Sequence, residues 1–246
     1  MRYFQTIILV GLILSASLYL LVLIPVNRLS DLKPISDGTG GFYPNERLGA
    51  ALKGAQFYRS LGCYYCHTRL VKPYELGTDY ERGWGIRRLV ARDFLADSLI
   101  LFGYIRLAPD LANIGLRKPE KFSIPWKYSS TNQTEQIGQF ENRLLTILYN
   151  PKLLNPKSIM PSFRFLFNDY VTNAQPFVVA SDNPMPKTLS INGQTVIPTE
   201  PAIYIVEYLK SMKSEYPLFE APPPPDPSRF IRRTTEITNV LQSVSP

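Results

Sequence analysis

The two cysteines and the single histidine of this chain lie within one stretch of five residues, Cys63-Tyr64-Tyr65-Cys66-His67. Thiols and imidazoles are side chains that proteins use to bind metals and to react covalently. Four kinds of site use two cysteines at this spacing: a structural zinc site, a thioredoxin-type dithiol, a disulfide and an attachment point for haem c. The rest of the sequence discriminates among them.

Three of these four sites fit the sequence poorly. A structural zinc site usually has four cysteine or histidine ligands, whereas this chain has three such residues in all. A thioredoxin-type dithiol follows a strand and precedes a helix, whereas the residues before Cys63 have a helical pattern. A disulfide between Cys63 and Cys66 is compatible with an oxidising compartment but gives His67 no role.

Attachment of haem c uses all three side chains for a chemical reason. The thiols of Cys63 and Cys66 add to the two vinyl groups of the porphyrin, whose separation matches the two intervening residues. The next residue then lies under the iron, so that an imidazole nitrogen of His67 becomes the proximal axial ligand. The motif therefore predicts one covalently attached haem c.

The sixth ligand of the iron is then a methionine, an asparagine or lysine, a small molecule or nothing, because the chain has no second histidine. Met212 falls in a predicted helix, where a methionine usually packs. Met160 lies on a loop pinned by proline and followed by aromatic residues. It therefore ranks ahead of Met185, which lies beside a predicted hairpin.

The N-terminus carries an apolar segment from Phe4 to Ile24 without a charged residue. A helix of this length spans about 30 Å, the thickness of a bilayer core. A cleaved signal peptide has a shorter apolar run and a small-residue cleavage site, and Ile24-Pro25-Val26-Asn27 offers none. We expect an uncleaved single-pass anchor. Because haem c is attached outside the bacterial cytoplasmic membrane, the domain after residue 28 is expected in the periplasm.

The composition fits a folded protein rather than a disordered one, with 45% hydrophobic residues and 22 prolines among 246 residues. A net charge of +7 is compatible with nucleic acid, an anionic membrane surface or an acidic protein. Together with the anchor, it leads us to expect membrane lipid and partner proteins, and no nucleic acid, as binding partners. Arg82, Arg87, Arg88 and Arg92 are expected to form a solvated basic face or to meet lipid head groups, and alternatively to pair with haem propionates or a partner subunit.

Periodicity predicts a mainly α protein with a small β-hairpin around Asn192-Gly193. The predicted helices span residues 45–61, 87–102, 109–118, 140–151 and 202–213, with an irregular polar stretch at 119–138 and a short helix after the Met160 loop. We divide the chain into a transmembrane anchor (1–28), a connector (29–44), a haem domain (45–220) and a proline-rich tail (221–246).

Several segments together resemble the mono-haem, membrane-anchored subunit II of cbb(3)-type cytochrome c oxidases, within the haem-copper oxidase family. These are GAQFYRSLGCYYCHTRLVKPYE, RGWGIRRLVARDF, GYIRLAPDLANIGLR and SIMPSFRFLF, in the order that the family has them. The resemblance covers the anchor and about residues 45–220. It departs from the family at Ala108, where a glycine is usual, and in the polar run from Trp126 to Asn142.

The resemblance implies a class I cytochrome c domain in which Cys63 and Cys66 hold the haem and His67 and Met160 bind its iron. It further implies that the carbonyl of Pro109 accepts the proton on the other ring nitrogen of His67. The chain would carry one electron at a time from another c-type cytochrome to the catalytic haem-copper subunit, without being catalytic alone. The alternatives are the cytochrome c subunit of a nitric oxide reductase, and a haem-bearing sensor or tether.

Overall fold

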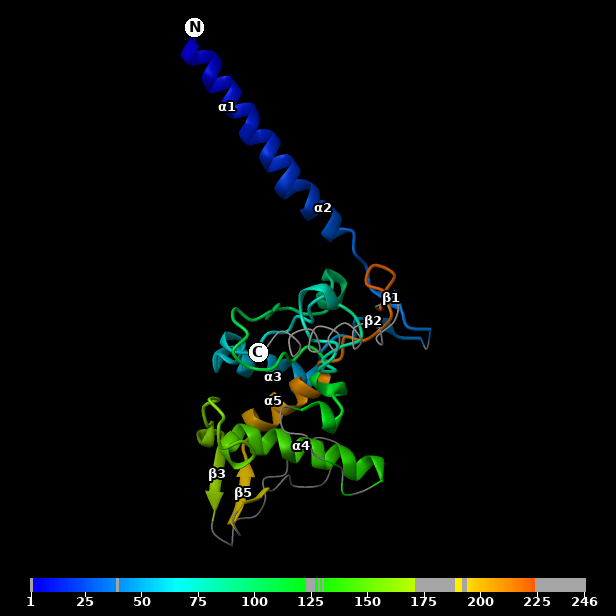
Figure 1. The fold of residues 1–246 in the computed structure, drawn as a ribbon, viewed down its shortest axis with the longest axis vertical. Coiled ribbons are helices and arrows are strands. Elements are labelled where there is room, and N and C mark those ends of the chain that lie inside the picture. Colours follow the sequence, from blue (N-terminus) through cyan, green and yellow to red (C-terminus); the bar gives the residue numbers. More distant parts are fainter. Residues whose placement is uncertain are drawn as a thin grey trace, which may run out of the picture. The chain divides into compact units, whose positions relative to one another are not determined.

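The computed structural model describes residues 2–38, 40–122, 127, 129, 131–170, 189–191 and 194–223. The chain divides into two compact units, which are described separately. The first comprises Met1–Glu46 and Val90–Ser98, and the second comprises Arg47–Leu89 and Leu99–Pro246. In both units together, the described residues form a mainly helical protein with one N-terminal apolar helix and small antiparallel sheets, as the sequence predicts (Figure 1).

The first unit begins with one long helix. It consists of α1 (Arg2–Leu18), the π-helical turn η1 (Tyr19–Leu23) and α2 (Ile24–Ser30). The wider turn of η1 ends two residues before Pro25, which lacks an N–H and crowds the preceding turn of an α-helix. The helix Tyr3–Ser30 has 28 residues, and its most apolar part has a mean hydropathy of 2.9 and is not buried against the rest of the described chain. By length and composition, this helix could cross a membrane.

The remainder of the first unit is a short hairpin with a 3-10 turn. Strands β1 (Ile35–Ser36) and β2 (Phe42–Tyr43) pair antiparallel, and η4 spans Ala91–Phe94. The predicted α-helix over 87–102 is wrong, since η4 is its only helical turn. The side chain of Asp93 explains this: it accepts hydrogen bonds from the Val90 backbone N–H at 2.8 Å and from the Tyr43 hydroxyl at 2.5 Å, which replaces a helical hydrogen-bond pattern with a local one.

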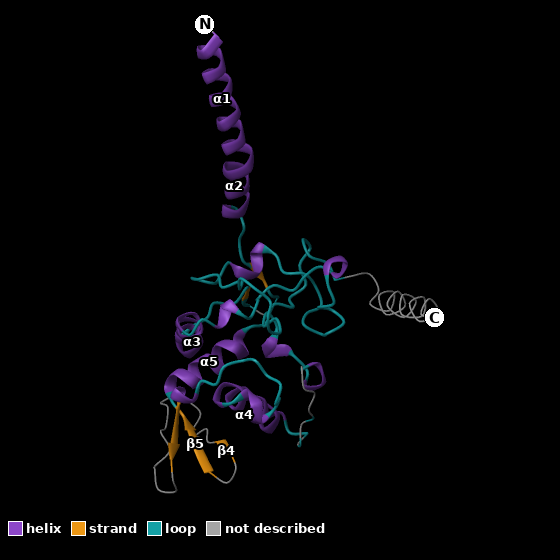
Figure 2. Cartoon of the chain, turned by 60° about the vertical axis from the view of Figure 1, so that its left-hand side comes forward, coloured by secondary structure: helices purple, strands orange, loops and turns teal. Residues whose placement is uncertain are grey.

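The second unit is built on α3 (Gly49–Ser60), α4 (Gln133–Tyr149) and α5 (Glu200–Ser211). Helices α3 and α5 lie side by side in both ribbon views, with α4 packed against α5 (Figures 1 and 2). Gly54 allows this approach, because a Cβ atom there would lie 1.8 Å from the backbone oxygen of Tyr204. At the contact between the two helices, the rings of Tyr58 on α3 and Tyr208 on α5 pack edge to face, with their centroids 5.3 Å apart.

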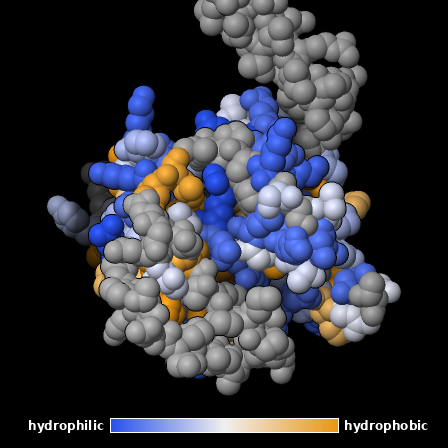
Figure 3. Space-filling model, turned by 90° about the horizontal axis from the view of Figure 1, so that it is seen from below, coloured by the Kyte–Doolittle hydropathy of each residue, from blue (hydrophilic) through white to orange (hydrophobic). Residues whose placement is uncertain are grey.

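Helix α4 begins seven residues before the predicted start at 140, so part of the stretch predicted as irregular is helical. Its start is fixed by Asn132, whose side chain accepts a hydrogen bond from the Thr134 N–H at 2.9 Å. Its buried face includes Leu144, Leu145 and Leu148, which join the core formed with α5. In the view from below, a group of hydrophobic side chains lies left of the centre, with hydrophilic side chains beside it (Figure 3).

A three-stranded antiparallel sheet has the strand order β3-β5-β4. The predicted hairpin is confirmed by β4 (Leu189–Ile191) and β5 (Gln194–Pro198), although its Asn192-Gly193 turn lies outside the described residues. Strand β3 (Phe167–Tyr170) pairs along the other side of β5, from Phe167 opposite Pro198 to Tyr170 opposite Thr195. The sheet thus ties the segment after Met160 to the start of α5.

The remaining regular elements are short 3-10 turns that join irregular segments. The predicted helix over 109–118 is wrong and contains only η5, because the side chain of Asp110 accepts a hydrogen bond from the N–H of Ala112 at 2.9 Å. The predicted short helix after the Met160 loop is the single turn η8. The turns of the second unit are η2 (Cys63–Tyr65), η3 (Tyr74–Leu76), η5 (Ile114–Leu116), η6 (Pro119–Lys121), η7 (Pro151–Leu153) and η8 (Arg164–Leu166).

Candidate functional site

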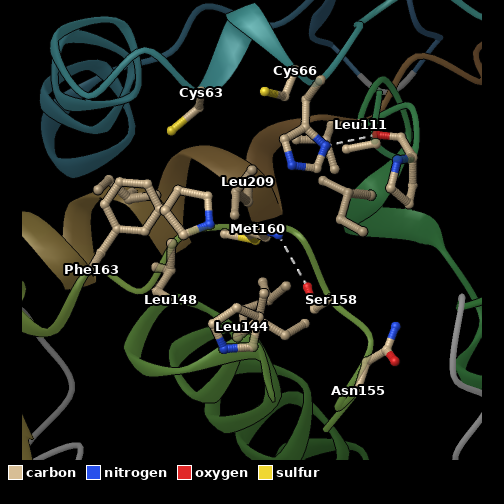
Figure 4. Close-up of a pocket in the computed structure, with 18 of the residues that line it drawn as sticks. Cys63, Cys66, Leu111, Leu144, Leu148, Asn155, Ser158, Met160, Phe163 and Leu209 are labelled. Atoms are coloured by element: carbon tan, nitrogen blue, oxygen red, sulfur yellow. Dashed lines mark hydrogen bonds between the residues drawn. The ribbon is translucent and has the colours of Figure 1, made fainter. Parts of the chain in front are cut away.

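The second unit contains a cavity of about 400 Å³ that brings the predicted site residues together. Cys63, Cys66, His67, Pro109 and Met160 all line it, and most of the other lining side chains are apolar. Figure 4 shows Cys63 and Cys66 on one wall, with Met160 and Leu144 across the cavity from them. Segments separated by almost a hundred residues therefore meet at one site.

The end of α3 positions the two cysteines. After Ser60 the chain turns through Gly62, whose φ of 72° lies in the left-handed region that glycine adopts readily. The turn η2 follows, and the N–H groups of Cys66 and His67 both donate to the carbonyl of Cys63, at 3.3 and 3.0 Å. This tight loop presents the Cys63, Cys66 and His67 side chains to the same cavity.

Both cysteines are free thiols in the structure. Burial raises the pKa of the Cys63 thiol to about 11, although a backbone hydrogen bond opposes the shift. A thiol of this kind stays protonated near neutral pH, whereas thiol–disulfide enzymes use an attacking cysteine with a lowered pKa. The environment of Cys63 therefore argues against the thioredoxin-type dithiol.

His67 is held by one of its two ring nitrogens. Its Nδ1 lies 2.8 Å from the carbonyl oxygen of Pro109, the contact that the family resemblance implies. A carbonyl can only accept, so Nδ1–H donates and Nε2 is the nitrogen with a lone pair available for a metal. Burial lowers the pKa of His67, with the Pro109 hydrogen bond opposing, and thereby favours the neutral imidazole that binds a metal.

The segment that carries Pro109 runs closely beside the cysteine motif. The N–H groups of Leu107 and Ala108 both donate to the carbonyl of Cys66 at 3.1 Å. Gly103, with φ of 87°, lets this segment approach, because a Cβ atom there would lie 2.3 Å from the backbone oxygen of His67. These main-chain contacts set the distance between His67 and Pro109.

A buried charge cluster fixes the same two segments. The carboxylate of Asp110 is fully buried and accepts from the Thr68 hydroxyl and the Leu70 N–H, both at 2.7 Å. Arg106 donates to Thr68 at 2.8 Å, to Asp110 at 3.2 Å and to Asp79 at 2.7 Å. Sequence reasoning included Arg106 and Asp110 in the motif that carries the resemblance, but it missed Thr68 and Asp79, which have no motif of their own.

Met160 reaches the cavity from the loop after α4. The N–H of Phe163 donates to the carbonyl of Leu148 at 2.9 Å, and the hydroxyl of Ser162 donates to the carbonyl of Tyr149 at 2.5 Å. These bonds anchor the loop to the end of α4, while Met160 is half-buried against the core. Met212, by contrast, is fully buried at the end of α5 and does not line the cavity, and Met185 lies outside the described residues.

The four arginines considered from the sequence do not line the cavity. Arg87 is not part of a solvated face as expected: it is 1% exposed and donates to the carbonyl of Tyr216 at 2.7 Å. Arg82 and Arg88 are exposed, and Arg92 donates to the Lys33 carbonyl within the first unit. The arginines that do line the cavity are Arg117 and Arg143. Sequence reasoning singled out neither: Arg117 is the last residue of the segment GYIRLAPDLANIGLR, and Arg143 lies outside every quoted segment.

The donor set of the cavity matches a haem better than a metal ion alone. Among the described residues, no group of three or more cysteine, histidine, aspartate or glutamate side chains could hold a metal ion. The cavity instead offers two thiols and an imidazole on one wall, a thioether on another, and an apolar interior. A scan of protein-family models finds no match to the chain, and no curated protein matches it.

Proposed function

We propose that the chain is a membrane-anchored c-type cytochrome that carries one electron at a time. The observation that carries the proposal is the convergence of Cys63, Cys66, His67 and Met160 on one apolar cavity of about 400 Å³. This volume falls within the range of small-molecule and cofactor sites, about 300–1,000 Å³. When bound, haem c supplies a one-electron couple between ferric and ferrous iron.

The chain's own residues have distinct roles in this proposal. Cys63 and Cys66 would hold the porphyrin through thioether links, and Nε2 of His67 would bind its iron. The Pro109 carbonyl, 2.8 Å from Nδ1, holds the ring in one tautomer and makes the opposite nitrogen more basic. Apolar side chains such as Leu144, Leu148 and Leu209 exclude water, which favours the less charged ferrous state. The second unit would then be a class I cytochrome c fold with haem in its core.

The location and the partners follow from the N-terminal helix and the family resemblance. The helix Tyr3–Ser30 supports a single-pass anchor. We place it in the inner membrane of a bacterium, with the haem domain in the periplasm, because haem c is attached on the outer side of that membrane. We further propose that the chain is the mono-haem subunit II of a cbb(3)-type cytochrome c oxidase. It would receive electrons from another c-type cytochrome and pass them to the catalytic haem-copper subunit.

Met160 distinguishes a carrier from a haem-bearing sensor. A sensor needs an open or labile coordination position, whereas a thioether within the same cavity as His67 can fill the sixth position. With both His67 and Met160 bound to the iron, this chain would offer oxygen no coordination position, so oxygen would be reduced elsewhere in the complex. A cytochrome c subunit of a nitric oxide reductase would share this site. The residues from Arg106 to Leu111 and the segment RGWGIRRLVARD favour the oxidase.

Replacing Met160 tests the assignment. Met160→Leu keeps the volume, so we expect a folded, haem-loaded chain that loses the weak charge-transfer band of a thioether-bound ferric haem and gains carbon monoxide binding. Met212→Leu is the matched control, because Met212 is buried in the core away from the cavity, and it should keep the band. If Met160→Leu retains the band and excludes carbon monoxide, another residue binds the iron.

A further inference from the structure

Three tyrosine rings pack on one another beside the cysteine motif. Tyr64 and Tyr65 lie between the two cysteines, and their ring centroids are 4.5 Å apart. The ring of Tyr104 lies 5.7 Å from that of Tyr65, with an angle of 18° between the two planes, and 5.5 Å from that of Tyr64. Each ring therefore holds the other two in place.

These rings lie on the surface of the second unit. Tyr65 and Tyr104 are each more than half exposed. Ile105 and Leu107, on the same segment as Tyr104, are also more than half exposed. We call this group of side chains the tyrosine patch: Tyr64, Tyr65, Tyr104, Ile105 and Leu107. Soluble proteins keep contiguous apolar surface small, and larger exposed patches mark places where another molecule binds.

The tyrosine patch is fixed to the loop that carries the cysteines, and it reaches the cavity. The N–H of Tyr104 donates to the carbonyl of Tyr64 at 3.1 Å, and the N–H of Leu107 donates to the carbonyl of Cys66 at 3.1 Å. Leu107 belongs to the patch and also lines the cavity. A protein bound at the patch would therefore lie beside the cysteine wall, to which the proposed haem would be attached.

The charge around the patch is positive. Neither residues 58–72 nor residues 98–109, the two segments that form the patch, contain an aspartate or a glutamate, whereas Arg59 is exposed. The pKa of Tyr64 is raised chiefly by its hydrogen bond with Tyr65, and the charge of Arg59 opposes the shift, so Arg59 acts on the patch electrostatically. Like charges that face each other across an interface are unfavourable. The occupant should therefore be an acidic protein and not a second copy of this chain.

We propose that the tyrosine patch is the docking surface for an acidic electron-donor protein, which delivers its electron to the haem across the cysteine wall. The inference rests on the proposed function and names the surface at which its donor binds. Tyrosine suits such a contact, because its ring buries a large area and its hydroxyl group can hydrogen-bond to the partner. The rings are already stacked, so binding costs little further side-chain freedom. A contact centred on so few side chains is small, as expected of a donor that leaves after each electron.

The first test compares two reductants of the ferric, haem-loaded full chain in detergent by stopped-flow absorbance. Reduced flavodoxin is a small acidic protein that donates an electron from its flavin, and reduced riboflavin donates from the same kind of ring without a protein surface. Tyr104→Ser should slow reduction by flavodoxin about fivefold or more, because an aromatic anchor is lost from the interface. Reduction by riboflavin should keep its rate. Phe219→Ser is the matched control, because it removes a fully exposed aromatic ring outside the patch.

The charge of the patch is tested separately. Arg59→Glu should slow reduction by flavodoxin about tenfold at low salt, because it removes electrostatic steering of the acidic protein. The difference from the wild type should shrink as the salt concentration rises, because salt screens exposed charges. If Tyr104→Ser does not accumulate with haem, Arg59→Glu decides. Equal rates with flavodoxin for either variant and Phe219→Ser would overturn the inference.

The second test identifies the occupant by acetylation of exposed tyrosines, read by mass spectrometry. Oxidised flavodoxin should protect Tyr65 and Tyr104, and an absence of protection would overturn the inference. Protection by vesicles of phosphatidylcholine and phosphatidylglycerol instead would assign the patch to lipid. Protection that grows with the concentration of the chain alone would assign it to a second copy. A chain that carries no covalent haem would refute the proposed function, whereas acetylation would still test the patch, which keeps the two failures distinct.

Discussion

Substituting Asp110 tests whether the buried charge cluster holds the two halves of the site together. Its carboxylate is fully buried and accepts hydrogen bonds from Thr68, Leu70, Arg106 and Ala112. Asp110→Ala leaves these donors without their acceptor and removes one of the two carboxylates that pair with the half-buried Arg106, the other being Asp79. Breaking a buried ion pair from one side costs roughly 3–5 kcal/mol, and we expect a loss of this size in the free energy of unfolding.

A loss of this size would be a large part of the whole stability, since domains unfold at about 5–15 kcal/mol. Denaturant unfolding of the full chain in detergent, followed by tryptophan fluorescence and far-ultraviolet circular dichroism, measures it. Glu120→Ala is the control, because it removes an exposed carboxylate and should change the stability by no more than about 0.5 kcal/mol. A loss below about 1 kcal/mol for Asp110→Ala would refute the structural role of the cluster.

Three further predictions concern other parts of the second unit. Gly54→Ala should destabilise the second unit by about 1–3 kcal/mol, because the new Cβ would lie 1.8 Å from the backbone oxygen of Tyr204. The control Gly138→Ala has open space around it and should stabilise α4 by about 0.5–1 kcal/mol. Equal effects of the two substitutions on thermal unfolding would contradict the close packing of α3 and α5. In the chain without haem, Cys63 should be alkylated slowly at neutral pH and faster toward about pH 11, because burial raises the pKa of its thiol. Mass spectrometry follows the reaction, and fast alkylation at neutral pH would point to a dithiol enzyme. Burial raises the pKa of Glu215 above its ordinary value of 4.5, so just above pH 4.5 the folded state keeps a proton that the unfolded state has lost. The free energy of unfolding should therefore fall as the pH rises through this window. Glu215→Gln should abolish this slope, and an unchanged slope would assign it to another group.

The elements that the sequence predicts well are those with a strong local pattern. The helix before Cys63 and the last helix each show one apolar face, and both form, as α3 and α5. Asn192-Gly193 between two alternating runs predicts the β4–β5 hairpin, which also forms. In these cases tertiary packing reinforces the local preference.

The sequence fails to predict two kinds of element: those in which a side chain competes for the hydrogen bonds of the backbone, and a strand whose partner strand is distant in the sequence. Asp93 and Asp110 both accept hydrogen bonds from nearby backbone N–H groups and replace two predicted helices by single 3-10 turns. Strand β3 was not predicted, because it pairs with β5, which lies more than twenty residues further along the chain.

Some residues of the candidate site can be identified from the sequence as a local motif, whereas others can be identified only from the structure. Cys63, Cys66 and His67 are visible as a contiguous motif, and all three line the cavity. Arg117 and Arg143 were not singled out from the sequence, although Arg117 ends the segment GYIRLAPDLANIGLR, because their place depends on which segments the fold brings to the cavity. The structure identifies them, together with Lys157, as basic residues that line it.

The amount of haem that remains on the denatured full chain tests the central proposal most directly. The chain is purified from cells that attach haem c, extracted with acidified acetone, and examined by intact mass and by absorbance. The proposal predicts one haem per chain that resists extraction, with digestion locating thioether links at Cys63 and Cys66. Haem that is extracted completely, or zinc in an amount equal to the protein with both thiols still free, would contradict it.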